Sequence, residues 1–288
     1  MSTAFCLFSL IVFTISGTSY PESQQYRYAE QLFGSGDYQA ARRAYKRLLF
    51  DHPDTQLRDA ADYRIAESYY HQNLPELAER RFQEFSATHL NSPLRFWSQL
   101  MLGQLHFDAE KYALARTMLF ELLNRSKDVE ITAAAHYLRG WCYVHTSDWN
   151  KAITEFRRAD ASEVNHPQRR KARQLADTVL NETPLSLKSP EMAGWFSTII
   201  PGSGQLYTGN VKEGIFAAAV TGTFIYLAAD AVRERRYVDC AGISLVGWHF
   251  YWGNRTDARR LASEYNEQRE QEFIEILKRQ ADSVLPQR

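Results

Sequence analysis

Residues 26–53, YRYAEQLFGSGDYQAARRAYKRLLFDHP, decide the fold, because their spacing of small and bulky residues recurs three more times at an interval of 37. In the second half of each copy, an alanine column is followed four positions later by a bulky column: Ala41, Ala78, Ala115, Ala152 and Tyr45, Phe82, Leu119, Phe156. In the first half, a small column is followed by a larger one: Ala29, Ala66, Gly103, Gly140 and Leu32, Tyr69, His106, Tyr143. So many matched columns indicate an internal repeat.

Each copy reads as two helices joined by a short turn. A small residue followed three positions later by a larger one marks one face of a first helix, and Gly34–Asp37 supplies a turn. The second helix places its alanine where the first must approach closely. One pair cannot bury its own apolar face, so neighbouring pairs stack. The sequence predicts an all-α solenoid of about four 37-residue pairs over residues 20–187, with residues 168–180 as a terminal cap helix.

This pattern resembles the tetratricopeptide repeat (TPR), whose spacings are met within Tyr26–Pro53 by a small first-helix column, Tyr38, Ala41 and Tyr45. The usual unit is about 34 residues, and the lengthened copies are similar to those of bacterial envelope scaffold proteins. The resemblance implies that the first helices line a concave groove for a protein or peptide partner. Its three rows are Tyr26, Tyr63, Leu100 and Tyr137; Glu30, Glu67, Gln104 and Trp141; and Phe33, Tyr70, Phe107 and Val144. A competing interpretation is that individual rings fill the core between repeats.

The N-terminal residues 1–19 read as a secretory signal peptide. Phe5–Ile15 is an apolar run too short to span a bilayer, and the small residues Gly17 to Ser19 favour cleavage before Tyr20. A retained N-terminal membrane anchor is the alternative. Both interpretations place the following segment outside the cytoplasm.

Two apolar segments follow the repeats, and we expect them to form a transmembrane helical hairpin over residues 188–253. Gly214–Ala229 carries no charge, and Arg233–Arg236 separates it from Tyr237–Trp252, which contains one acid. Both are shorter than the roughly 20 residues that span a bilayer. Aromatic residues nevertheless flank them as in an interfacial belt: Trp195, Trp248, Tyr251 and Trp252. We therefore expect contact with lipid through residues 195–252, with a buried soluble helix pair as the alternative.

The motif PGSGQLYTG, residues 201–209, precedes the first apolar segment. It is similar to a P-G-x-G-Q-x-Y-x-G signature that opens small bacterial integral-membrane domains, met here by Pro201, Gly202, Gly204, Gln205, Tyr207 and Gly209. The similarity extends over residues 191–266 and implies a membrane domain without assigning it a chemistry. Residues 254–288 read as an amphipathic C-terminal helix for partner docking or self-association, with folding back on the repeats as the alternative. A homo-oligomer through the hairpin or this helix is therefore one possibility.

Composition argues against several classes of function. The 34 basic residues balance 34 acidic residues, so no bulk field attracts nucleic acid. The three cysteines lie far apart, and the eight histidines show no metal-ligand spacing. We expect no catalytic residue, no cofactor and no metal, and hence no enzyme.

Together these patterns predict a membrane-anchored scaffold or adaptor of the bacterial cell envelope. It would sit in the inner membrane with its repeats in the periplasm, because a hairpin then places the turn arginines Arg233, Arg235 and Arg236 in the cytoplasm. The arginines of residues 255–260 argue for the opposite orientation. One alternative is a hairpin-centred membrane protein that assists membrane-protein insertion or forms a small oligomeric conduit. Another is a soluble periplasmic TPR chaperone.

Overall fold

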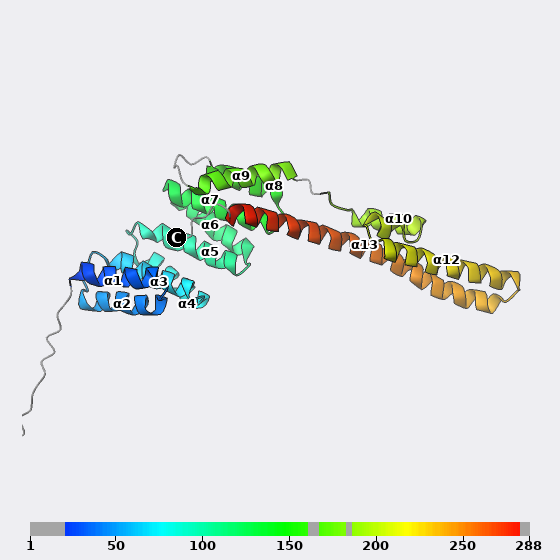
Figure 1. The fold of residues 1–288 in the computed structure, drawn as a ribbon, viewed down its shortest axis with the longest axis horizontal. Coiled ribbons are helices and arrows are strands. Elements are labelled where there is room, and N and C mark those ends of the chain that lie inside the picture. The colour runs from blue at the N-terminus through cyan, green and yellow to red at the C-terminus, as the bar shows by residue number, and fades with distance from the viewer. Residues whose placement is uncertain (1–20, 161–166, 183–185, 283–288) are drawn as a thin grey trace, which may run out of the picture. The chain divides into compact units, whose positions relative to one another are not determined.

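A computed structural model describes residues 21–160, 167–182 and 186–282 (Figure 1). These residues form helices and no strand, as the sequence predicts. The expected signal peptide at residues 1–19 lies outside the described residues. The chain divides into two compact units, of which the first ends at Ile131 and the second begins at Thr132.

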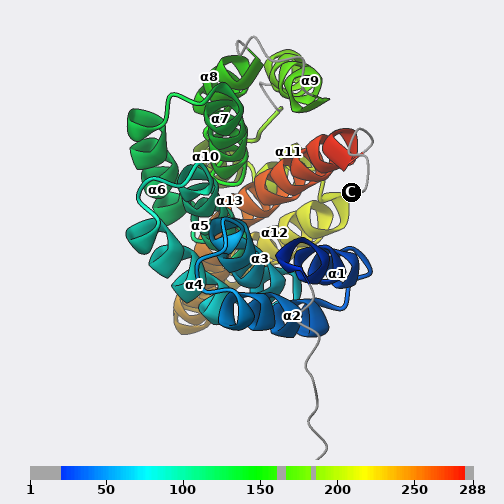
Figure 2. The same ribbon diagram turned by 90° about the vertical axis from the view of Figure 1, so that its left-hand side faces the viewer.

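The first unit consists of three helix pairs. Their helices are α1 (Glu22–Gly34), α2 (Tyr38–Asp51), α3 (Arg58–His71), α4 (Pro75–Thr88), α5 (Leu94–Asp108) and α6 (Tyr112–Arg125). Each helix packs against the next, and α3 also contacts α5. Figure 2 shows α1 to α6 as successive pairs. The repeats therefore stack as the columns predict.

The repeated columns form the core. The alanines and the bulky residues of all four second helices are fully buried: Ala41, Ala78, Ala115, Ala152, Tyr45, Phe82, Leu119 and Phe156. A Cβ atom added to Gly103 would lie 2.7 Å from a Leu119 methyl carbon, and one added to Gly140 would lie 2.5 Å from the Phe156 ring. The small first-helix column thus exists because the bulky second-helix residue lies directly on it.

The turn within each pair repeats in its backbone as well as in its position. One residue per turn has a positive φ, at the same interval of 37: Gly36 (84°), Asn73 (56°), Glu110 (58°) and Ser147 (54°). In the first turn the Asp37 amide donates to the Leu32 carbonyl at 3.0 Å, a bond typical of a helix that ends in a left-handed residue. Glycine fills this position in only the first copy, so the sequence pattern does not reveal it.

The second unit holds the fourth pair and everything beyond it. Its helices are most of α7 (Val129–Val144), α8 (Trp149–Asp160), α9 (Pro167–Glu182), α10 (Pro190–Ile199), α11 (Ser203–Tyr207), α12 (Val211–Arg233) and α13 (Tyr237–Asp282). α9 packs on α8 at the predicted cap position, whereas α10, α11 and α12 pack on α13.

α13 is one helix of 46 residues. The sequence pattern instead predicts that the hairpin ends at residue 253 and that a separate C-terminal helix begins at residue 254. The stretch around that boundary, Tyr251–Asp257, contains no proline and a single glycine. Ending the helix there would leave backbone carbonyl groups without partners, so the helix continues.

The C-terminal part of α13 is covered by the last repeat. Phe273 is 2% exposed and lies 5.3 Å from Trp149 of α8, measured between ring centroids. Leu277 is fully buried, and the Ser147 hydroxyl donates to a Glu270 carboxylate oxygen at 2.7 Å. Two apolar side chains of this part of α13 are therefore buried inside the chain, and α9 and α13 both cover the end of the solenoid.

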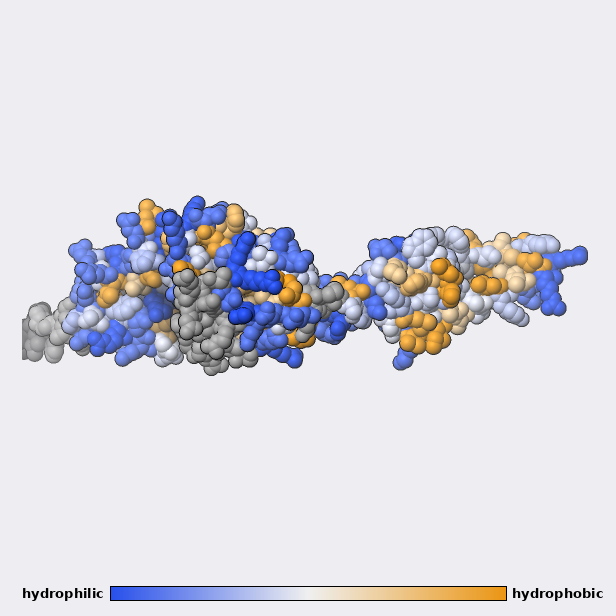
Figure 3. All heavy atoms as spheres, turned by 90° about the horizontal axis from the view of Figure 1, so that it is seen from above, coloured by the Kyte–Doolittle hydropathy of each residue, from blue (hydrophilic) through white to orange (hydrophobic). Residues whose placement is uncertain are grey.

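The paired α12 and first part of α13 present apolar side chains outward (Figure 3). α12 is the one described helix that is long and apolar enough to cross a bilayer, and 11% of its apolar window is buried. Large exposed side chains of this hairpin include Ile215, Phe216, Ile225, Tyr226, Val238 and Leu245. A buried soluble helix pair would instead hide these residues.

The core position of Phe82 gives a test of the repeat packing. Phe82→Ala should lower the free energy of unfolding by about 3–5 kcal/mol, because it leaves a cavity under the small column of α3. Phe50, which is 85% exposed, supplies the control, and Phe50→Ala should change stability by less than about 0.5 kcal/mol. Urea titrations followed by helical circular dichroism measure both; equal losses would contradict the assignment of the core.

Candidate functional site

The predicted groove positions lie on the first helices of the repeats. α1 carries Tyr26, Glu30 and Phe33; α3 carries Tyr63, Glu67 and Tyr70; and α5 carries Leu100, Gln104 and Phe107. Spacings of three and four residues place each set on one face of its helix. Tyr137 and Trp141 lie on α7 in the second unit.

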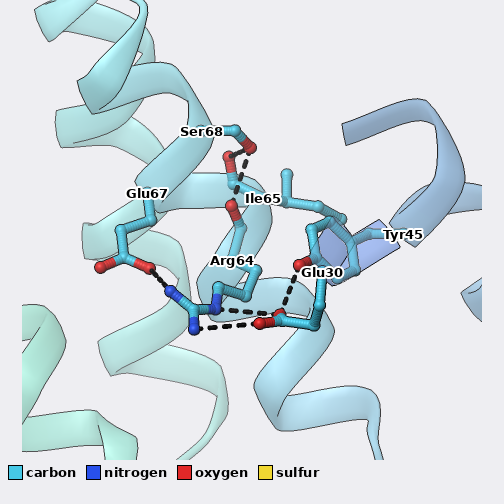
Figure 4. Close-up of polar contacts among 6 residues, drawn as sticks. All are labelled: Glu30, Tyr45, Arg64, Ile65, Glu67 and Ser68. Atoms are coloured by element: carbon cyan, nitrogen blue, oxygen red, sulfur yellow. Dashed lines mark hydrogen bonds and ion pairs between the residues drawn. The ribbon is translucent and has the colours of Figure 1, made fainter. Parts of the chain in front are cut away.

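Arg64 connects the two glutamates of the groove (Figure 4). Its Nε and Nη2 atoms donate to the two oxygens of Glu30 at 3.0 and 3.1 Å, and its Nη1 atom donates to Glu67 at 2.8 Å. The Tyr45 hydroxyl also donates to Glu30. The pair of carboxylates thus shares one guanidinium and keeps a net charge of about −1. The repeat pattern does not single out Arg64, because its position holds Arg27 in the first copy but Met101 and Leu138 in the third and fourth.

This cluster shifts the pKa values of the groups around it. Burial and then the charge of Glu30 raise the pKa of Tyr26 to about 12. Burial and the hydrogen bond to Glu30 raise the pKa of Tyr45 as well. Burial lowers the pKa of Arg64, but Glu67 and Glu30 raise it by more. The phenols therefore stay neutral and Arg64 stays charged at neutral pH.

Several of the predicted groove residues belong to the core. The Tyr63 ring lies 5.7 Å from Phe82 and 5.9 Å from Phe85, and Leu100 is 9% exposed. In the second unit, Tyr137 and Trp141 both pack on the Phe156 ring, and Val144 is fully buried. These side chains therefore contribute to the packing between helices.

Four of the remaining groove positions in the first unit form a strip together with Asp108, a residue absent from the predicted rows. The Tyr70 hydroxyl donates to Asp108 at 2.8 Å, and the Gln104 amide donates to its other oxygen at 2.7 Å. Burial and Asp108 raise the pKa of Tyr70. We define the groove strip as Phe33, Glu67, Tyr70, Gln104 and Asp108. It combines two aromatic rings with two carboxylates.

The glycines of the PGSGQLYTG motif allow close approaches of the backbone. Gly202 caps α11 with a φ of +89°, and a Cβ atom there would lie 2.0 Å from the Gly214 carbonyl oxygen. A Cβ atom on Gly204 would lie 2.0 Å from the Ala193 carbonyl oxygen and 2.8 Å from the Ala258 side chain. Side chains at these positions are excluded by their surroundings, which explains the spacing of the motif.

Gln205 connects α10, α11 and α13 through a buried hydrogen-bond network. Its side chain is 2% exposed. Its Oε1 atom accepts from the Ser197 hydroxyl at 2.9 Å, and its Nε2 atom donates to the Asn254 carbonyl at 3.1 Å and to the Asn254 side-chain oxygen. The Ser197 oxygen in turn accepts from the Gly204 amide at 3.0 Å. The polar side chains of the motif are therefore used to hold helices together.

The linker before α10 is fixed to the same junction. The Asn266 side chain accepts from the Lys188 amide at 2.7 Å and donates to the Lys188 carbonyl at 2.8 Å. The Tyr207 hydroxyl accepts from the Ser189 amide at 3.3 Å, and the Tyr207 ring lies 5.3 Å from Phe196. Tyr207 of the motif and Asn266 of α13 thus hold adjacent residues of the same linker.

Metal-ligand geometry is not found among the described residues: no three His, Cys, Asp or Glu side chains are grouped to hold an ion. Cys142 is buried and Cys240 is partly buried, and no disulfide joins these two cysteines. Arg64 pairs with both Glu30 and Glu67, and Gln205 is hydrogen-bonded to both Ser197 and Asn254. The side chains of these two polar clusters thus use their hydrogen-bonding groups on one another.

The raised pKa of Tyr26 predicts a dependence of stability on pH. A phenol whose pKa is raised on folding stabilises the protein fully below its unfolded value of about 10. That contribution is lost as the pH rises from 10 through about 12. Tyr26→Phe should therefore reduce the loss of stability above pH 10, whereas Tyr28→Phe, at a 59% exposed position, should not. Urea unfolding midpoints measured between pH 9 and pH 12 for the wild type and both variants test this prediction. Identical pH profiles for the wild type and Tyr26→Phe would contradict a raised pKa for Tyr26.

The contacts of Gly204 predict that a single methyl group disturbs the junction. Gly204→Ala should cost about 1–3 kcal/mol, because the new Cβ atom meets backbone that cannot move aside. Gly253 on α13 has nothing within 4 Å of a Cβ atom, so Gly253→Ala should be neutral or stabilise the helix by up to about 1 kcal/mol. Thermal unfolding followed by tryptophan fluorescence separates the two, and a harmless Gly204→Ala would show that the approach is not tight.

Comparison with known proteins identifies the repeat region. A family model described as a tetratricopeptide repeat-like domain matches residues 16–181, more than half of the chain. A comparison with curated proteins gave no match. The matched range contains α1 to α8 and all but the last residue of α9. The chain belongs to the tetratricopeptide repeat-like domain family.

Proposed function

We propose that the chain is a membrane-anchored scaffold or adaptor that binds a protein or peptide segment along its repeats. Tetratricopeptide repeat-like domains are typically interaction modules without catalytic activity, and membership of that family carries the first half of the proposal. The groove strip offers partly exposed rings beside two carboxylates. That chemistry suits an extended or helical segment with an apolar side chain and a basic residue.

The charge of the strip supports a basic partner. Arg64 pairs with both oxygens of Glu30 but with one oxygen of Glu67. Among the described residues, Asp108 accepts hydrogen bonds from two neutral groups and from no cation. A lysine or arginine of the partner would find unpaired negative charge at these two carboxylates. Burying such a charge in the groove requires this pairing.

The outward apolar surface of α12 and α13 supports the anchor. α12 is long enough to cross the hydrocarbon layer, and charged groups gather at the turn after it. There Arg236 contacts Asp230 at 3.3 Å, Glu234 at 2.8 Å and Asp239 at 3.2 Å. These pairs reduce the cost of placing acids next to lipid. Aromatic residues at the other end favour the headgroup region: Trp195, Trp248, Tyr251 and Trp252.

The continuity of α13 supports a mechanical link between the anchor and the last repeat. From Trp252 to Phe273 the helix rises by roughly 30 Å, at about 1.5 Å per residue. Its exposed part is reinforced by pairs one turn apart, including Arg260 with Glu264 at 2.7 Å and Arg269 with Glu272 at 2.9 Å. An anchor of this kind raises the effective concentration of the groove near the membrane.

We further propose the bacterial inner membrane as the location, with the repeats in the periplasm. The expected signal peptide and the resemblance to bacterial membrane domains support it. The turn arginines Arg233, Arg235 and Arg236 favour a cytoplasmic turn. Arg255, Arg259 and Arg260 at the opposite end favour the reverse orientation, so the orientation depends on export of the N-terminal region.

A second candidate function centres on the hairpin, as an oligomer that assists membrane-protein insertion or forms a conduit. The observation that favours it is a cavity of about 490 Å³ beside α12 and α13, lined by Thr221, Phe224, Ser244, Gly247 and Trp248 among others. The soluble periplasmic chaperone is disfavoured, because it would expose the apolar hairpin to water.

Photo-crosslinking in washed membranes tests the proposal. A photoreactive residue at Gln104 in the groove strip should capture a protein partner, whereas one at Gln83, exposed on the second helix α4, should not. The full chain should stay in the pellet after alkaline carbonate extraction. Deletion of residues 190–254 keeps the α13 segment that covers the last repeat, and this variant should be released while still crosslinking through Gln104.

Each contrary outcome removes a different part of the proposal. Release of the full chain by carbonate would exclude the anchor. Equal capture at Gln104 and Gln83, or none at Gln104, would exclude the groove strip. Capture that disappears with the hairpin, while the isolated hairpin keeps the partner, would support the second candidate instead.

A further inference from the structure

α10 lies antiparallel on α13 at the level where the apolar hairpin ends. The Tyr251 hydroxyl donates to the Thr198 carbonyl at 2.6 Å, while Ala193 packs with Ala258 and Ala262 near the other end of α10. The outer face of α10 and the residue after it is apolar, with Trp195 58%, Ile199 75% and Ile200 63% exposed. α10 therefore extends the apolar surface of the hairpin along the first polar turns of α13.

Two arginines of α13 lie against this short helix. The Arg255 guanidinium lies 5.6 Å from the Trp195 ring centroid and 5.1 Å from that of Trp252, and its Nε atom is buried without a hydrogen-bond partner. Arg259, one turn later, lies across Gly194, where an added Cβ atom would come within 2.6 Å of its Nε atom. The glycine of α10 thus makes room for an arginine side chain.

Neither arginine is paired with an acidic side chain in the part of the molecule that the structure describes. Within the described residues, Arg255 and Arg259 have no carboxylate oxygen within 4.0 Å, whereas their neighbour Arg260 pairs with Asp257 and Glu264. The Lys188 amine, which is fixed to the same junction, lies over the rings of Tyr207 and Tyr265. Two like charges four residues apart on a helix destabilise it. An anion bound between them would remove that repulsion.

We propose that Arg255 and Arg259, framed by Trp195 and Trp252, bind the phosphate of an anionic phospholipid headgroup. Arginine forks match phosphate oxygens, and tryptophan rings favour the headgroup layer of a bilayer. The exposed apolar side chains of α10 fit the acyl region directly beside that phosphate. A lipid satisfies both halves of the surface, whereas free phosphate satisfies one. This inference rests on the proposed membrane anchoring and adds a lipid preference to it.

Lipid titration of the full chain in mild detergent tests the site. Phosphatidylglycerol should raise the thermal unfolding midpoint, and phosphatidylcholine or inorganic phosphate at equal concentration should not. The double variant Arg255→Gln and Arg259→Gln should need at least tenfold more phosphatidylglycerol for the same shift. Arg260→Gln, which removes a paired arginine from the adjacent position, should respond like the wild type. Lysine at both positions should restore part of the response.

The outcomes separate this site from the anchor itself. A double variant that keeps the wild-type response, or a wild type that responds equally to inorganic phosphate, would overturn the lipid site. Carbonate extraction of the same variants reports on anchoring independently, and the double variant should stay in the pellet. Matching helical circular dichroism of the variants in detergent excludes misfolding as the cause of a lost response.

Discussion

The helix α13 carries an exposed apolar surface at its start and is buried against the final repeat at its end. This constraint determines how the second unit is organised. The first turns of α13 leave Val238 and Leu245 open on the outside of an apolar hairpin, while its last turns bury Phe273 and Leu277 under the final repeat. Between them, ion pairs one turn apart support a charged stretch that water can solvate. Because the helix is unbroken, a tilt of the hairpin also displaces the residues of α13 that cover the solenoid.

The four repeats share one packing arrangement between their two helices, and polar side chains on the groove side add contacts that are not repeated. A bulky second-helix residue needs a small partner on the first helix, which fixes the register of every pair. Arg64 uses the space left on the groove side to bridge α1 and α3 through Glu30 and Glu67. Hydrogen-bonding capacity consequently remains at Glu67 and Asp108, in the strip that we propose as the binding surface.

Sequence periodicity predicts the all-helical solenoid because the column residues act locally, through contacts between helices adjacent in the chain. It does not predict the role of Arg64, because one of its partners, Glu30, lies on the preceding first helix and its own position is occupied by Met101 and Leu138 in the third and fourth copies. The left-handed turn residues Glu110 and Ser147 escape notice for another reason, because their side chains do not favour positive φ. Gln205 and Asn254 are distant in sequence, so their pairing within the PGSGQLYTG junction emerges only from the fold.

Spin labels along α12 and α13 in lipid vesicles test most directly whether the hairpin and the following stretch of α13 occupy different solvents. Labels at the exposed apolar positions Ile215, Ile225 and Leu245 should collide preferentially with oxygen, which concentrates in the hydrocarbon layer. Labels at Glu264 and Glu272, farther along α13, should collide preferentially with a water-soluble nickel complex. The same preference for the nickel complex at all five positions would contradict a bilayer-embedded hairpin.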